Sequence, residues 1–275
     1  MVKKAKKLAV FDIDGTIFRK NLHFELINEL VWLGAFPNIV RRQLTEVYSG
    51  WLEHEGTYED YRHAIVDLYS KYIKGCTEAS VREASRLVVS FQAKKTYIFA
   101  ENLIRQLRKE GYHIIAVSGS PLEIVEEYNR DYLKFDFVYG SVYGKDADGF
   151  YTGEALFEPS KDKGIVVKQY AYEQGIDLAD SYGIGDTESD IRFLDIVDHP
   201  IAFNPNQNLL AAARKAGWRV VVEKKDVIYE ISEPAHSPSS SDSGRQGTGS
   251  NEQGTRNVNQ RTRNRERGMT KKKSS

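Results

Sequence analysis

Leu8-Ala-Val-Phe-Asp-Ile-Asp-Gly-Thr16 is the stretch of sequence that decides the fold. Its four apolar residues, 8–11, end abruptly at two aspartates and a glycine, which is the pattern of a buried strand that leaves a sheet into a turn. Asp12 and Asp14 are two residues apart, so their carboxylates lie on the same side of an extended chain. When two carboxylates lie close together, the pKa of one of them rises unless a cation is near. Such a pair suits a site that uses one ionised and one protonated carboxyl group. A solvated Asp-Gly turn would have the same sequence, so this stretch needs support from elsewhere.

The segment that follows, residues 18–95, has a helical pattern. Apolar and aromatic side chains recur at spacings of three and four residues in four successive stretches. Thr57 and Thr77 stand where N-caps would begin two of the helices. We therefore expect a helical cap inserted after the first strand. The four stretches are Leu22 to Leu33, Val40 to Trp51, Tyr61 to Tyr72 and Val81 to Phe91.

From about Thr96 onward, short apolar strands alternate with helices. Ser120-Pro-Leu-Glu123 has the spacing of a capping box with proline at N1, so we expect a helix to begin there. This alternation predicts an α/β fold, a Rossmann-like parallel sheet with helices on both faces, whose ligands bind at the carboxyl ends of the strands. The expected catalytic core is 1–17 with 96–231. Its expected strands are 113–117, 137–139, 181–184, 201–203 and 218–222; its expected helices are one through Leu103 and others over 164–174, 191–194 and 209–216; a hairpin is expected over 142–155.

Charge is unevenly distributed along the 275 residues, which include 39 basic and 39 acidic ones. Residues 232–275 carry 9 Lys or Arg against 4 Asp or Glu, which leaves 30 basic and 35 acidic residues in the body. A mildly acidic body argues against nucleic acid as the main ligand, because a phosphate backbone requires a basic surface. Residues 232–275 contain only Val258 and Met269 as core-forming side chains, so we expect a disordered basic tail. Any nucleic-acid binding should be weak and confined to that tail.

Compartment and membrane association can also be judged from composition. Cys76 is the single cysteine, so no internal disulfide can form and nothing indicates an oxidising compartment. No stretch approaches the roughly 20 apolar residues that cross a bilayer. The lysine-rich start resembles a signal peptide, but the apolar run after it stops at Asp12, short of the about 7–15 residues required. We therefore expect a cytoplasmic protein without a membrane partner; the oligomeric state is left open.

Three further polar groups accompany the first motif. Ser118 and Gly119 follow an expected strand, where backbone N–H groups and a hydroxyl form an anion site, although an ordinary capped loop would look alike. Asp186 and Asp190 follow another strand, where carboxylates could hold a hard cation or merely favour a helix start. Between them, Lys163 could neutralise a phosphate, or could be simply solvated.

In this order the four elements are specific, and over residues 8–223 the chain resembles the haloacid dehalogenase-like hydrolase superfamily, in its phosphoserine-phosphatase-like branch (subfamily IB). Asp12-Ile-Asp-Gly-Thr16 is similar to the first motif, Ser118 to the second, Lys163 to the third, and Gly185-Asp186 with Asp190 to the fourth. Lys161 competes with Lys163, which we prefer because a small residue follows it at a helix start. A second aspartate two residues after the nucleophile marks the phosphatases of the superfamily.

The resemblance implies a role for each site residue. Asp12 would be the nucleophile that forms an aspartyl-phosphate, and Asp14 the general acid and base. Ser118, Gly119 and Lys163 would bind the phosphate. Mg²⁺ would be held by Asp12, the backbone carbonyl of Asp14 and Asp186, with Asp190 supporting a bound water. We therefore expect a magnesium-dependent hydrolase of a small phosphorylated metabolite.

The substrate is the weak point of the resemblance. Phosphoserine phosphatases grip their amino acid with a glutamate shortly after the first motif and an arginine in the cap. Here Asn21 stands where the glutamate aligns and Ile65 near the arginine position, with Arg62 close but out of register. L-phosphoserine is therefore possible and not favoured. Further cap candidates, each more simply read as a surface group, are His23, Glu25, Arg41, Arg42 and His63.

Two other functions share these features. A phosphotransferase would use the same aspartyl-phosphate and pass the phosphoryl group to another alcohol. A binding protein with a phosphatase fold, recruited through its basic tail, would need no intact catalytic set.

Overall fold

The computed structural model describes residues 7–231 of the chain. The expected disordered tail, 232–275, lies outside the described residues and remains a prediction. Within the described part, no helix is both long and apolar enough to cross a membrane.

An eight-stranded mixed sheet forms the centre of the described part, in the order β4-β3-β2-β1-β5-β6-β7-β8. The six inner strands, β3, β2, β1, β5, β6 and β7, are parallel to one another, which confirms the α/β expectation. The edge strands β4 and β8 are antiparallel to their neighbours. The β3–β4 hairpin was expected, but β8 was not. The turn before β8 contains no glycine and places Lys225 at φ +59°, so it lacks the usual sequence signal of a hairpin. The strands are β1 (Leu8–Phe11), β2 (His113–Pro121), β3 (Phe137–Lys145), β4 (Tyr151–Phe157), β5 (Tyr182–Gly185), β6 (His199–Phe203), β7 (Arg219–Lys224) and β8 (Val227–Ile231).

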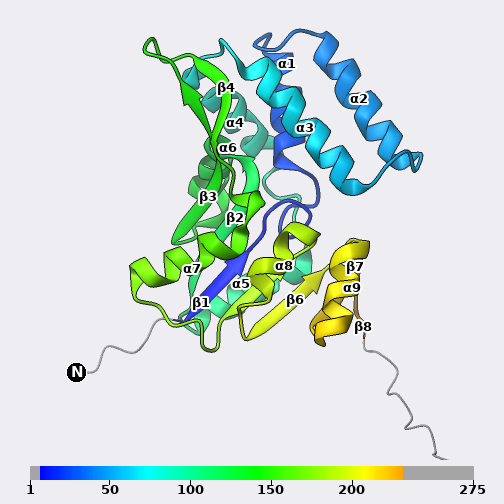
Figure 1. The fold of residues 1–275 in the computed structure, drawn as a ribbon, viewed down its shortest axis with the longest axis vertical. Helices are drawn as coiled ribbons and strands as arrows, with labels where there is room; N and C mark the ends of the chain where they lie inside the picture. The colour runs from blue at the N-terminus through cyan, green and yellow to red at the C-terminus, as the bar shows by residue number, and fades with distance from the viewer. Residues whose placement is uncertain (1–6, 232–275) are drawn as a thin grey trace, which may run out of the picture. The chain divides into compact units, whose positions relative to one another are not determined.

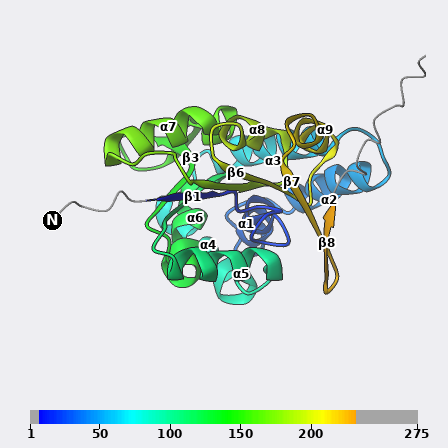
Figure 2. The ribbon, with the colours of Figure 1, turned by 90° about the horizontal axis from the view of Figure 1, so that it is seen from below.

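Helices cover both faces of this sheet. Figure 2 shows α7 (Lys163–Gln174), α8 (Ile191–Leu194) and α9 (Gln207–Ala216) on one face, and α5 (Ile98–Lys109) and α6 (Leu122–Tyr128) on the other. In β1, Leu8 and Val10 pack into the apolar cluster of α7–α9, whereas Ala9 and Phe11 pack into the opposite cluster. A strand buried on both faces needs apolar residues throughout, which explains the uninterrupted run before Asp12. Short helical turns connect these elements: the π-helical Asn129–Leu133 and the 3₁₀ turns Pro159–Lys161 and Glu188–Asp190.

The expected helical insert, residues 18–95, contains four helices beyond the carboxyl end of β1 (Figure 1). Thr57 and Thr77 cap two of them as predicted, each accepting a hydrogen bond from the backbone three residues on. The chain leaves and re-enters the core at one point, where Tyr97 N–H donates to the Ile17 carbonyl at 3.0 Å. The division into a core and a separate cap domain remains a prediction. The helices are α1 (Leu22–Trp32), α2 (Ile39–Leu52), α3 (Tyr58–Ile73) and α4 (Glu78–Gln92).

The insert is also attached to the core away from this junction. Helix α3 packs against β4, and α4 packs against α6. The Gly75 N–H donates to the Tyr151 carbonyl, and the Tyr151 N–H donates to the Cys76 carbonyl, both at 2.9 Å. The hairpin thus pairs with the loop between α3 and α4.

Candidate active site

The two aspartates of the first motif lie at the carboxyl end of β1, on the edge that faces the insert. Gly15 follows them with φ +83°, and a Cβ atom there would lie 1.9 Å from Asp186 Oδ2. Two features therefore require glycine at this position: the positive φ angle of the backbone and the close approach of the Asp186 carboxylate. The turn after β1 brings the first and fourth motifs into contact.

A buried ion-pair network joins the first, third and fourth motifs. Lys163, the first residue of α7, is 2% exposed, and its Nζ lies 2.5 Å from Asp12 Oδ1 and 2.6 Å from Asp190 Oδ1. Burial raises the pKa of Asp12 to about 7, although the Lys163 charge opposes that shift. The Lys161 ammonium pairs with Glu158 instead and is mostly exposed. The structure therefore brings Lys163, and not Lys161, to Asp12.

Asp14 has a different environment from Asp12. Its Oδ1 accepts a hydrogen bond from the Leu22 N–H at 2.5 Å, and its Oδ2 accepts from the hydroxyls of Ser118 at 3.0 Å and Ser120 at 2.6 Å. Burial raises the pKa of the Asp14 carboxyl, while these donors work against the shift. The Asp12 carboxylate therefore faces an ammonium, whereas the Asp14 carboxylate faces neutral hydrogen-bond donors.

The helix start predicted at Ser120 is wrong in detail. Strand β2 continues to Pro121, α6 begins at Leu122, and Pro121 occupies the N-cap position without a side-chain cap bond. The extended backbone puts Ser120 on the same side as Ser118, so its hydroxyl binds Asp14 and not the helix. Ser120 is a site residue that sequence reasoning missed because a local capping signal masked it.

Three carboxylates could together hold a cation: Asp12, Asp186 and Asp190 each offer an oxygen within 4.8 Å of the others. The Asp12 Oδ2 atom is buried and has no hydrogen-bond partner among the described residues. Burial and the two neighbouring carboxylates raise the pKa of Asp186 well above its usual range. An unpartnered oxygen in an oxygen-only donor set fits a hard divalent cation such as Mg²⁺. The Asp14 carboxylate is not in this group, in keeping with the expectation that only its backbone carbonyl would serve.

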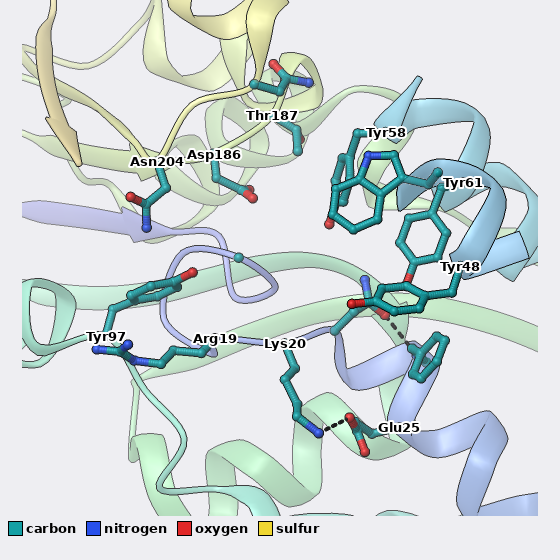
Figure 3. A pocket seen from close by; sticks show the side chains of 15 residues that line it. Arg19, Lys20, Glu25, Tyr48, Tyr58, Tyr61, Tyr97, Asp186, Thr187 and Asn204 are labelled. Atoms are coloured by element: carbon teal, nitrogen blue, oxygen red, sulfur yellow. Dashed lines mark hydrogen bonds and ion pairs between the residues drawn. The ribbon is translucent and has the colours of Figure 1, made fainter. Parts of the chain in front are cut away.

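Two cavities meet above these residues. The inner cavity, about 30 Å³, is lined by Asp12, Asp14, Lys163, Gly119 and other residues of both core and insert. The aromatic cavity, about 680 Å³, lies beside it under α2 and α3 (Figure 3). Both are lined by four common residues: Asn21, Tyr58, Asp186 and Thr187.

The candidate specificity residues divide between these cavities and the outer surface. Asn21 lines both cavities and caps α1, since its Oδ1 accepts from the Phe24 N–H at 2.8 Å. Glu25 lines the aromatic cavity, and His23 and Arg62 line the inner one. Three further candidates line neither cavity: Arg41, Arg42 and His63.

His23 and Arg62 are unequal in their bonding. Arg62 Nε donates to Glu59 Oε2 at 2.9 Å. His23 is buried with its Nε2 unpartnered among the described residues, and burial together with the Arg62 charge lowers its pKa to about 3. The imidazole is therefore neutral at physiological pH.

The aromatic residues around the larger cavity are the other group that sequence reasoning missed as site residues. Tyr48, Trp51 and Tyr61 fit the helical periodicity of α2 and α3, which predicted a buried helix face. A helix face that lines a cavity has the same spacing as one that packs against a neighbour. Only the tertiary structure separates the two cases.

Comparison with known proteins identifies the family of the chain. The family model described as haloacid dehalogenase-like hydrolase matches residues 9–195, and the chain therefore belongs to that family. It is 22% identical over 233 residues to the histidinol-phosphatase of Neisseria meningitidis, covering 78% of this chain and 98% of that protein. It is 26% identical over 216 residues to the phosphoserine phosphatase of Streptomyces coelicolor, 78% of this chain but only 48% of that longer protein.

A solved substrate-bound phosphoserine phosphatase complex is also similar, with a TM-score of 0.56 and 23% identity over 82% of this chain and 96% of the other. At this identity the likeness shows the fold alone. Together, the family match and the named relatives confirm the phosphoserine-phosphatase-like branch, and the protein is an enzyme of the phosphatase class.

Proposed function

We propose that the protein is a magnesium-dependent phosphomonoesterase that works through an aspartyl-phosphate on Asp12. The observation that supports this most directly is the buried, unpartnered Oδ2 of Asp12, next to an ammonium and two further carboxylates. Mg²⁺ would be held by Asp12, the Asp14 backbone carbonyl and Asp186, with Asp190 supporting a bound water, and its positive charge would stabilise the negative charge of the phosphoryl oxygens.

The first half of the reaction transfers the phosphoryl group to the enzyme. An oxygen of Asp12 forms a bond to phosphorus while the bond from phosphorus to the alcohol oxygen breaks. Asp14 gives its proton to the departing alkoxide, so that a neutral alcohol leaves. The raised pKa of Asp14 suits it to carry that proton.

The second half releases phosphate. Asp14, now ionised, accepts a proton from a water molecule as the water oxygen attacks phosphorus, and the bond between phosphorus and Asp12 breaks. Inorganic phosphate leaves, and both carboxyl groups return to their starting states. A phosphotransferase would differ only here, by admitting an acceptor alcohol in place of water.

Three groups would bind the phosphoryl oxygens. The Lys163 ammonium has three N–H donors, of which two meet Asp12 and Asp190, so one remains for the phosphate. Gly119 lines the inner cavity, and its backbone N–H would be the second donor. Ser118 would contribute its hydroxyl after turning it from Asp14 towards the phosphate.

The test is phosphate release from p-nitrophenyl phosphate with Mg²⁺, combined with acid trapping of radiolabelled phosphoenzyme. Wild type should turn over and yield an alkali-labile acyl phosphate that maps to Asp12. Asp12→Asn should lower kcat at least about 10⁴-fold, because an amide cannot act as the nucleophile. Label on Asp14, or full activity in excess chelator, would contradict the proposal. Adding acceptor alcohols separates transfer from hydrolysis.

A further inference from the structure

The size of the aromatic cavity is the first clue to the substrate. A substrate held by its phosphate at Asp12 must extend past Asn21, Tyr58 and Thr187, three of the four residues common to both cavities, into a space of about 680 Å³. Cavities of about 300–1,000 Å³ accommodate drug-sized molecules. A three-carbon amino acid would leave most of this volume unfilled.

The side of the cavity formed by the insert is a wall of aromatic rings. Trp51 and Tyr61 are stacked with centroids 5.4 Å apart, Tyr58 meets Trp51 edge-on at 5.3 Å, and Tyr48 lies 5.9 Å from Tyr61. Figure 3 shows Tyr48, Tyr58 and Tyr61 facing Tyr97 across the cavity. Because the rings support one another, this wall exists before any ligand binds. Flat ring systems gain most from such surfaces, by offset stacking or edge-to-face contact.

The charges around the cavity cancel. Lys20 Nζ lies 2.7 Å from Glu25 Oε1, and the other Glu25 oxygen accepts from Gln92 at 2.8 Å. Arg19 pairs with the buried Glu223 carboxylate and lies over the Tyr97 ring. Of the charged residues lining this cavity in the described part of the chain, only Asp186 has no opposite charge, and it belongs to the cation site. An ammonium or carboxylate substituent would meet no unpaired opposite charge among these lining residues outside the cation site, and removing such a charge from water without a partner is costly.

We propose that the aromatic cavity binds the alcohol part of the substrate, and that this part is an uncharged, flat ring system of one or two rings. The inference rests on the proposed phosphomonoesterase function. It assigns to Tyr48, Trp51, Tyr58 and Tyr61 the choice among phosphate monoesters, and it excludes amino-acid phosphates as preferred substrates.

The test compares phosphate esters whose alcohol parts differ in size and shape but whose bonds from phosphorus to oxygen are similarly difficult to break. Ethyl phosphate and 2-naphthylmethyl phosphate have alcohols of similar acidity, so a difference in kcat/KM reports on binding of the body. L-phosphoserine supplies the zwitterionic case. We expect kcat/KM for the naphthylmethyl ester to exceed those of both others at least about tenfold, a gain of the size that aromatic stacking provides.

Two variants place this preference at the cavity. Trp51→Leu, and separately Tyr48→Leu at a partly exposed position, should raise KM for the naphthylmethyl ester at least about fivefold more than for ethyl phosphate. Trp32→Leu is the matched control: Trp32 also lies in the insert but is 75% exposed and lines neither cavity, so it should change neither value. Thermal unfolding verifies that each variant is folded.

The outcomes separate the two proposals. Turnover of p-nitrophenyl phosphate with equal kcat/KM for the three esters, or with L-phosphoserine preferred, would overturn the ring inference alone. A loss in Trp51→Leu and Tyr48→Leu that is the same for ethyl and naphthylmethyl esters would do the same. Absence of turnover on every monoester, p-nitrophenyl phosphate included, would overturn the phosphomonoesterase proposal and the inference with it.

Discussion

The strand-end edge of the core and the aromatic wall of the insert face the same cavities but are built in opposite ways. At the core edge, Asp12, Asp190 and Lys163 are almost completely buried and bind one another directly. On the insert side, the surface consists largely of rings, and its charged residues Lys20 and Glu25 pair with each other. On the proposed function, the core edge would carry the reaction, whereas the insert would select among substrates by shape. The comparison teaches that reaction and selection are separable here, so each should fail alone when its own residues change.

The largest effect should come from the lysine at the centre of the core edge. Lys163→Ala removes the cation between two buried carboxylates, which costs about 3–5 kcal/mol when one partner of a buried pair is lost. We expect a lower midpoint of urea unfolding and loss of phosphatase activity with every ester alike. Lys161→Ala is the matched control at an exposed lysine two residues away and should leave stability and activity within about twofold of wild type. A strong loss in the control variant would show that the wrong lysine has been placed at the site.

Asp14→Asn should have the next largest effect, and it should depend on the leaving group. The amide cannot donate a proton, so kcat for ethyl phosphate should fall by about 10²–10⁴. p-Nitrophenolate leaves without protonation, so phosphoenzyme formation from its ester should be far less affected. Single-turnover measurement of both esters checks this, and an equal loss for the two would refute the acid role of Asp14.

Mg²⁺ binding should depend on pH because it competes with protons at the carboxylate group. Burial raises the pKa of Asp12 to about 7 and that of Asp186 well above its usual range. Folded pKa values above the unfolded ones mean that the cation-free protein loses stability as pH rises towards about 7, because burial disfavours the charged forms of these groups. Mg²⁺ should offset that loss, so its affinity should increase between pH 6 and 7, by up to about tenfold per pH unit for each proton released.

Titration calorimetry in two buffers of different ionisation enthalpy measures the protons released on Mg²⁺ binding. Asp186→Ala should weaken binding and reduce that release. Binding with no proton release at pH 6 would show that the group is already ionised.

The smallest effect should follow removal of residues 232–275. All four motifs lie between residues 12 and 190, and β8 ends at Ile231. A truncation after Ile231 should keep kcat/KM within about twofold of wild type on every ester, since neither the core edge nor the aromatic wall is changed. A specific loss with ring-bearing esters alone would mean that the segment contributes to selection.

The core edge could be predicted from the sequence in considerable detail. Asp12 and Asp186 directly follow β1 and β5, so their meeting follows from the rule that the carboxyl ends of parallel strands lie at one edge of a sheet. Lys163 follows no parallel strand and was assigned to the site through the family resemblance, although it is 151 residues from Asp12 in the chain. Their catalytic roles remain predictions, but the motif residues of the core edge gather where the strand pattern placed them. Residues after a strand are easy to identify because the strand itself is marked by an apolar run.

The insert side could be predicted only in outline. Helical periodicity gave the four helices but could not tell a ring that packs in a core from a ring that lines a cavity, as for Trp51 and Tyr61. The contact of Ser120 with Asp14 was not predicted because the local sequence has the pattern of a helix cap. In the structure the Ser120 hydroxyl instead donates to Asp14, 106 residues away in the chain. In each case the position of the side chain is determined by contacts between residues far apart in the chain, and the spacing of neighbouring residues does not predict such contacts.

The backbone pairing of the hairpin with the loop after α3 has a mechanical consequence. The insert is joined to the core where Ile17 meets Tyr97, and again where Gly75 and Cys76 meet Tyr151. A lid attached along a single crease can swing open as a whole, but a second anchorage away from the crease prevents that rotation. Substrates must then enter without a rotation of the whole insert, past side chains that line the cavities, among them Trp51 and Tyr58. On this view, substrate entry requires no slow swing of a domain, and movements of side chains and loops on the nanosecond to microsecond scale suffice.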